Sequence, residues 1–114
     1  MIQDDINTSL TKIEIFWENI SKESSDDPDA YGYIATQTMS LKMTAFHLKD
    51  NIEIEILKDK KARLKLQKLQ KALENIVNKL DFKIHAIKNK EYIESILNKL
   101  SKIKEDIEVV RLYK

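Results

Sequence analysis

The chain has 114 residues, and its 20 basic and 19 acidic residues leave a formal net charge of +1. This length is typical of one domain with a buried core, so we expect residues 1–114 to form a single domain. The sequence contains no cysteine, which excludes disulfides and thiolate chemistry, and its one glycine and one proline leave no glycine-rich phosphate loop. No stretch approaches the ~18 consecutive apolar residues of a membrane span, and the acidic N-terminus predicts no signal peptide. We therefore expect a cytoplasmic protein.

The first predicted element is a helix over residues 2–22. Apolar residues recur there in steps of three and four, which places them on one side of a helix: Ile2, Ile6, Leu10, Ile13, Trp17 and Ile20. A short acidic and serine-rich segment then interrupts the pattern. Because Asp27 is suited to the N-cap position and Pro28 to the first helical position, a second helix is predicted over residues 28–57.

Two further helices are predicted in the second half of the chain, over residues 60–88 and 90–113. Four consecutive charges at 58–61 interrupt the apolar pattern at the first boundary. At the second boundary, Asn89 tolerates the left-handed conformation that ends many helices. Neither boundary contains glycine or proline, so a helix that continues across one of them is an alternative.

The four apolar stripes together predict the fold. Each amphipathic helix must bury its stripe against the others, which favours an all-α fold, an antiparallel four-helix bundle in the order up-down-up-down. Three short segments, 52–56, 82–85 and 107–109, alternate in polarity as strands do. The helical spacing continues through all three, so we interpret them as parts of helices.

The second predicted helix carries more apolar surface than a bundle helix needs. Beside its main stripe lies a second apolar set, Met39, Met43 and Phe46, with Ile54 and Leu57 beyond it. Unbranched methionine suits adaptable binding faces, and an excess apolar face often marks a contact with another protein. Met39, Met43 and Phe46 are therefore the predicted partner-binding site. The alternative is that neighbouring helices or the segment 23–30 cover them.

Lysines on one flank of the third predicted helix form a second candidate site. Lys61, Lys65 and Lys68 lie on this flank, together with Lys79 and Lys83. One hypothesis is that they bind an anion such as nucleic-acid phosphate. The other is that they pair with acidic residues of the last helix, as flanking positions do in coiled coils: Glu91, Glu94, Glu105 and Glu108. The low net charge and the absence of aromatic residues among the lysines favour pairing.

The sequence shows no pattern typical of a metal site or an enzyme. His47 and His85 are the only histidines, and neither has the glutamate three residues earlier that di-metal helical bundles use. No nucleophile elbow, phosphate loop or zinc-protease motif is present. We therefore predict no catalytic residues, no metal and no cofactor.

The sequence thus favours a non-enzymatic helical protein that acts by binding another protein, in the manner of an adaptor, chaperone, immunity protein or inhibitor. The expected partner is a different protein or a second copy of the chain in a homodimer. The alternative function is a nucleic-acid-associated module that uses the lysine flank. The salt dependence of binding separates the two, since phosphate contacts weaken steeply with salt.

Overall fold

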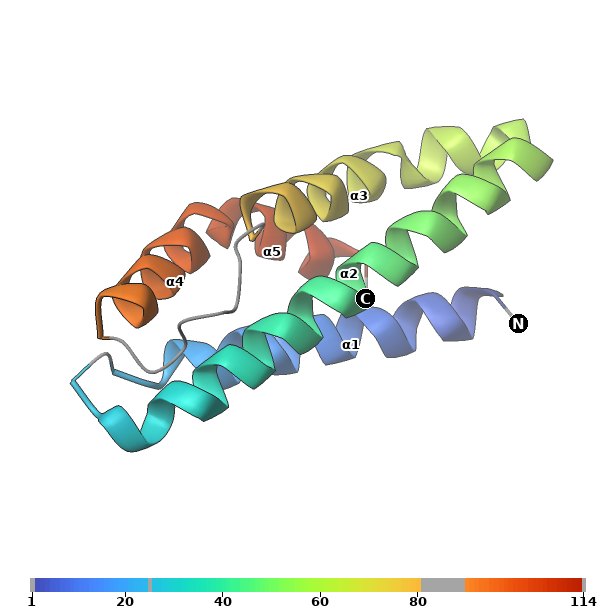
Figure 1. The fold of residues 1–114 in the computed structure, drawn as a ribbon. Coiled ribbons are helices and arrows are strands. Elements are labelled where there is room, and N and C mark those ends of the chain that lie inside the picture. The colour runs from blue at the N-terminus through green and yellow to red at the C-terminus, as the bar shows by residue number, and fades with distance from the viewer. Residues whose placement is uncertain (1, 25, 81–89, 114) are drawn as a thin grey trace.

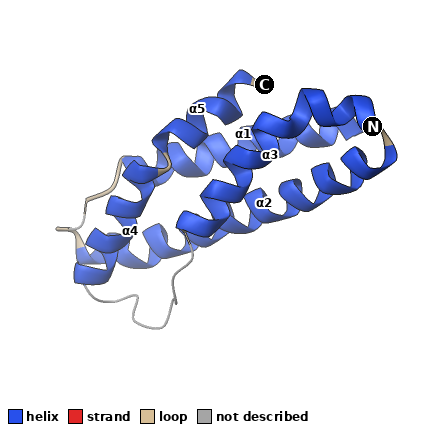
Figure 2. Ribbon diagram, turned by 90° about the horizontal axis from the view of Figure 1, so that it is seen from above, coloured by secondary structure: helices blue, strands red, loops and turns tan. Residues whose placement is uncertain are grey.

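The computed structural model describes residues 2–24, 26–80 and 90–113 (Figure 1). Within these ranges every regular element is a helix (Figure 2). In chain order these are α1 (Ile2–Ser21), the short 3-10 helix η1 (Pro28–Ala30), α2 (Tyr31–Lys58), α3 (Lys60–Lys79), α4 (Lys90–Lys102) and α5 (Lys104–Leu112). The predicted all-α fold is therefore confirmed. The predicted four-helix bundle is not, because the described part of the chain contains five α-helices.

The connection between α1 and α2 follows the capping pattern that the sequence predicts. The Asp27 carboxylate accepts a hydrogen bond of 3.0 Å from the backbone N–H of Asp29, and Pro28 occupies the first position of η1. This turn leads directly into α2, which has 28 residues. The predicted second helix therefore corresponds to η1 followed by α2.

A single residue, Asp59, joins α2 to α3. Its backbone is extended, with φ −139° and ψ 110°, and its carboxylate accepts a hydrogen bond of 3.0 Å from the backbone N–H of Lys61. Asp59 thus ends one helix and caps the next, within the charged segment where the sequence predicts the break. At its other end α3 stops at Lys79 rather than at the predicted residue 88. Residues 81–89, which include the predicted boundary at Asn89, lie outside the described part of the chain.

The predicted apolar stripes build the core. Fully buried side chains come from all five α-helices, with Ile107 and Val110 from α5. The largest of them are Leu10, Ile13, Ile20, Ile34, Leu41, Ile52, Leu69, Leu73, Ile76, Leu80, Ile93 and Ile96. Trp17, which lies on the α1 stripe, is only half-buried and packs against this core from its edge. The segments 52–56 and 107–109, which alternate in polarity, are helical, whereas the third such segment, 82–85, lies outside the described residues. The part of the chain that the structure describes contains no helix long and apolar enough to span a membrane.

The predicted last helix is divided into α4 and α5 at Ile103, which is fully buried. A contact from α3 stabilises the break. The Lys79 ammonium donates a hydrogen bond of 3.2 Å to the carbonyl oxygen of Lys102 and pairs at 3.3 Å with the carboxylate of Asp106. Asn75 donates a further hydrogen bond of 3.2 Å to Asp106. Because the chain bends here, α4 contacts α1 and α2, whereas α5 packs against α3 and α1.

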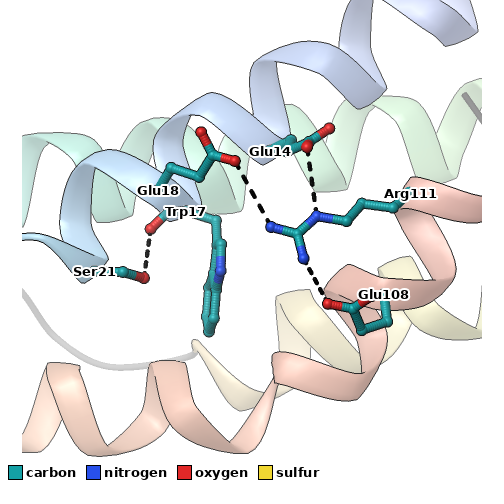
Figure 3. A network of polar contacts seen from close by, with 6 residues as sticks. All are labelled: Glu14, Trp17, Glu18, Ser21, Glu108 and Arg111. Carbon is teal, nitrogen blue, oxygen red and sulfur yellow. Dashed lines mark hydrogen bonds and ion pairs between the residues drawn. The ribbon is translucent and has the colours of Figure 1, made fainter.

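Polar contacts also attach the last helices to the first half of the chain. Arg111 of α5 reaches α1, where its guanidinium pairs with Glu14 at 3.4 Å and Glu18 at 3.7 Å, and it also pairs with Glu108 on its own helix (Figure 3). The Trp17 ring points from α1 toward the last two helices beside this network (Figure 3). At the beginning of α4, Lys90 pairs at 2.8 Å with Asp26 of the α1–α2 connection.

Candidate functional site on the outer face of α2

The three residues of the predicted partner-binding site lie together on the outer side of α2. At 100° per residue they fall within about 60° of each other and about 140° from the middle of the buried stripe on the same helix. Met39 and Met43 are each 46% exposed, and Phe46 is 40% exposed. The packing of the chain therefore leaves these three large apolar side chains nearly half accessible.

The apolar surface continues toward the C-terminal end of α2. Ile54 is 50% exposed and Leu57 is 85% exposed, and both lie on the same side of the helix as Met39 and Met43. We call the five residues Met39, Met43, Phe46, Ile54 and Leu57 the outer strip. It follows most of the length of α2, whose opposite side forms the core.

A charged cluster divides the outer strip near its middle. The Lys49 ammonium lies 5.3 Å from the centre of the Phe46 ring, which is within the range of a cation–π contact. The same ammonium is 3.7 Å from a carboxylate oxygen of Asp50 and 3.7 Å from one of Glu53. His47 packs edge-on against Phe46, with the ring centres 5.9 Å apart. A partner of the whole strip therefore has to meet two apolar patches and the polar group between them.

The structure places the three lysines of the second candidate site on one helix, α3, where they line two different hollows. Lys61, Lys65 and Lys68 are all exposed. Lys61 and Lys65 line a cavity beside the α2–α3 turn, whereas Lys68 lines a different hollow, between α3 and α5. An ion pair of the kind predicted between the third helix and the last one joins Lys79 to Asp106, an acid that the sequence analysis did not single out. Lys83 lies outside the described residues.

The histidines are placed unequally. His47 lies exposed on α2 beside Phe46, and His85 falls outside the described residues. Among the residues that the structure describes, no group of three or more histidine, aspartate or glutamate side chains is arranged to hold a metal ion.

Comparison of this chain with known protein families, with curated proteins and with solved structures gives no match. The functional argument therefore depends on the geometry and chemistry of the chain's own residues.

Proposed function

We propose that this protein acts by binding another protein through the outer strip of α2. The observation that carries the proposal is the exposure of Met39, Met43 and Phe46, each at 40% or more, on successive turns of a helix whose other side is fully packed. Burying a large apolar side chain stabilises by about 1.5–3 kcal/mol relative to leaving it in water. A partner that covers these three residues gains much of that free energy, and α2 presents them on a rigid scaffold.

The charges along the strip favour a different protein over a second copy of this chain. Consider two copies of α2 paired in antiparallel orientation, with Met39 of one copy opposite Leu57 of the other. In this arrangement Asp50 of each copy would meet Phe46 of the other copy. The two Lys49 side chains would also face each other. In a parallel pair the two Asp50 carboxylates would meet. The described partner of Asp50 is the Lys49 ammonium at 3.7 Å, which is too far for a hydrogen bond, and burying a carboxylate that makes no hydrogen bond is unfavourable. We therefore infer a partner with an apolar ridge or groove that offers a hydrogen-bond donor opposite Asp50.

The test compares capture and affinity for two double variants. Met39→Lys with Met43→Lys places charge on the strip, and the matched control Asn78→Lys with Asn98→Lys adds the same charge at exposed positions on other helices. We expect the wild-type chain and the control to bind the same partner, and the strip variant to lose it. Light scattering on the wild-type chain should give the mass of a monomer. A dimer that the strip variant dissociates would show that the strip pairs copies of this chain.

The lysine flank provides the competing function, and its geometry favours it less. A nucleic-acid surface needs several phosphate-binding groups along one track. Lys61, Lys65 and Lys68 lie on one flank of α3, but Glu55 and Asp59 lie beside Lys61 and Lys65 and offset their charge. Binding that falls steeply with salt and disappears in Lys61→Glu with Lys65→Glu, but not in the strip variant, would favour the nucleic-acid function.

A further inference from the structure

A cavity of about 410 Å³ lies at the end of the molecule that contains the α2–α3 turn. The last described turn of α5 lies partway along α1 and α2, and those two helices and α3 extend past it toward this end (Figure 1). Three segments that are far apart in the sequence therefore line the cavity: the beginning of α1, the α2–α3 turn and Tyr113. Its volume is within the range of ~300–1,000 Å³ that is typical of small-molecule sites.

The floor of the cavity is apolar. It is formed by Ile6 of α1, Ala62 and Leu66 of α3, and Tyr113. Ala62 and Leu66 belong to the same helical stripe as Leu69, yet they are only half-buried whereas Leu69 is fully buried. The core-facing side of α3 thus has apolar surface at this end that the described packing leaves partly uncovered.

The rim of the cavity carries two lysines on one side of α3. Lys61 and Lys65 are one helical turn apart, so their side chains are neighbours on the helix surface. Among the described residues neither ammonium makes an ion pair. The Asp59 carboxylate, also on the rim, accepts the hydrogen bond from the backbone N–H of Lys61 and so caps α3. Glu55 is the other acid of the rim and is half-buried.

We propose that this cavity binds a small amphipathic carboxylate of the fatty-acid type, with its chain on the apolar floor and its carboxylate between the Lys61 and Lys65 ammonium groups. The site is separate from the outer strip of α2, and the proposal does not depend on the proposed function. The balance of charge on the rim selects the ligand class. Two lysines and two acids leave the rim with no net positive charge to attract a polyphosphate or a nucleic acid, whereas one carboxylate is small enough to pair locally with the two neighbouring ammonium groups.

The first experiment titrates the full chain with decanoate, below its micelle concentration, by calorimetry. We expect saturable binding of one molecule per chain. Affinity should rise with chain length from octanoate to dodecanoate, by up to about fourfold for each methylene that is buried. Decanol, which lacks the charge, should bind more weakly. Equal binding of decanol, or no saturation, would overturn the proposal.

Matched variants locate the site. Lys61→Ala with Lys65→Ala should weaken decanoate binding by about tenfold, because two charge-assisted contacts are lost. The control Lys68→Ala with Lys71→Ala removes the same charge from α3 outside the cavity and should leave the affinity unchanged. Equal weakening by both pairs would show a general charge effect and would contradict the proposal.

Two further experiments distinguish binding of a free carboxylate in the cavity from binding on the outer strip and from binding to a membrane surface. Met39→Gln with Met43→Gln should bind decanoate as the wild type does, and a loss would place the ligand on the outer strip instead. Vesicles of phosphatidylcholine with phosphatidylserine should not retain the chain on sedimentation. Retention that depends on Lys61 and Lys65 would show that the lysines bind a membrane surface rather than a free carboxylate.

Discussion

Replacing Lys79 by methionine tests the contact that stabilises the break between α4 and α5. The Asp106 side chain is only 11% exposed, and its partners are Asn75 and the Lys79 ammonium. Removing one partner of a fully buried ion pair destabilises by about 3–5 kcal/mol, and removing one partner of a buried hydrogen-bonding group by about 1–3 kcal/mol. Lys79 is 44% exposed, so water can partly replace its ammonium. We therefore expect a loss of about 2 kcal/mol, which lowers the melting temperature of a chain of this size by roughly 8 °C.

A double-mutant cycle measured by urea unfolding and far-ultraviolet circular dichroism gives the pairwise contribution. The cycle consists of Lys79→Met, Asp106→Asn and the double variant. Asp106→Asn retains the shape of the side chain and an oxygen that accepts from Asn75, but it removes the charge. Because the double variant has no unpaired buried charge, it should lose less stability than the two single changes added together. Strict additivity, or a loss below about 0.5 kcal/mol for Lys79→Met, would refute the reasoning.

Three other predictions follow from the contacts described above. Met39→Lys with Met43→Lys should remain folded and lose less than about 2 kcal/mol by urea unfolding, because both side chains are nearly half exposed and lysine retains an apolar stem; unfolding of the variant would place the strip in the core. Trp17→Ala should lose about 2–3 kcal/mol, below the ~3–5 kcal/mol of a fully buried aromatic residue, because the ring lies at the edge of the core. A loss below about 1 kcal/mol would contradict this packing. The hydrogen bond with Lys90 lowers the pKa of the Asp26 carboxyl and raises the pKa of Lys90. Their pairing should therefore stabilise the fold at neutral pH and be lost as the pH falls through the folded-state pKa of Asp26 or rises through that of Lys90. The difference in melting temperature between the wild type and Asp26→Asn should thus be present at neutral pH and vanish in strong acid, and a difference that persists in strong acid would contradict the pairing.

The helices could be predicted from the sequence where local chemistry determines them. The apolar residues of α1, α2 and α3 recur at helical spacing, and Asp27 and Asp59 cap their helices through hydrogen bonds to residues two positions away. Such signals lie within a few residues of their effect. The breaks at these two aspartates agree with the prediction, which rested on Asp27 and Pro28 for the first break and on the four consecutive charges at 58–61 for the second.

The break at Ile103 could not be predicted in the same way. It has neither glycine nor proline, and the apolar spacing runs through it without interruption. The contacts that stabilise it come from another helix. Lys79 donates to the carbonyl oxygen of Lys102, and Asn75, which is 31 residues from Asp106, donates to the Asp106 carboxylate. A local pattern contains no information about such a contact, and so the sequence predicted one helix where the structure has α4 and α5.

The candidate sites likewise differ in whether local spacing or the tertiary fold brings their residues together. The outer strip could be predicted because its residues share one helix, so their spacing alone places them together. The cavity could not, because Ile6, Leu66 and Tyr113 come from three separate segments that only the tertiary fold brings together. For the lysines, the helical wheel gave a common flank, but it did not show that Lys61 and Lys65 face a different hollow from Lys68.

Photo-crosslinking from the outer strip tests the central claim most directly. Benzoylphenylalanine is placed at position 46 in one variant and, as a control, at the exposed position of Asn78 on α3. We predict that the probe at position 46 forms one adduct with a different protein in the source cells, that the probe at position 78 forms none, and that Met39→Lys with Met43→Lys abolishes the adduct. Equal adducts from both positions, no adduct from position 46, or an adduct between two copies of this chain would contradict the account.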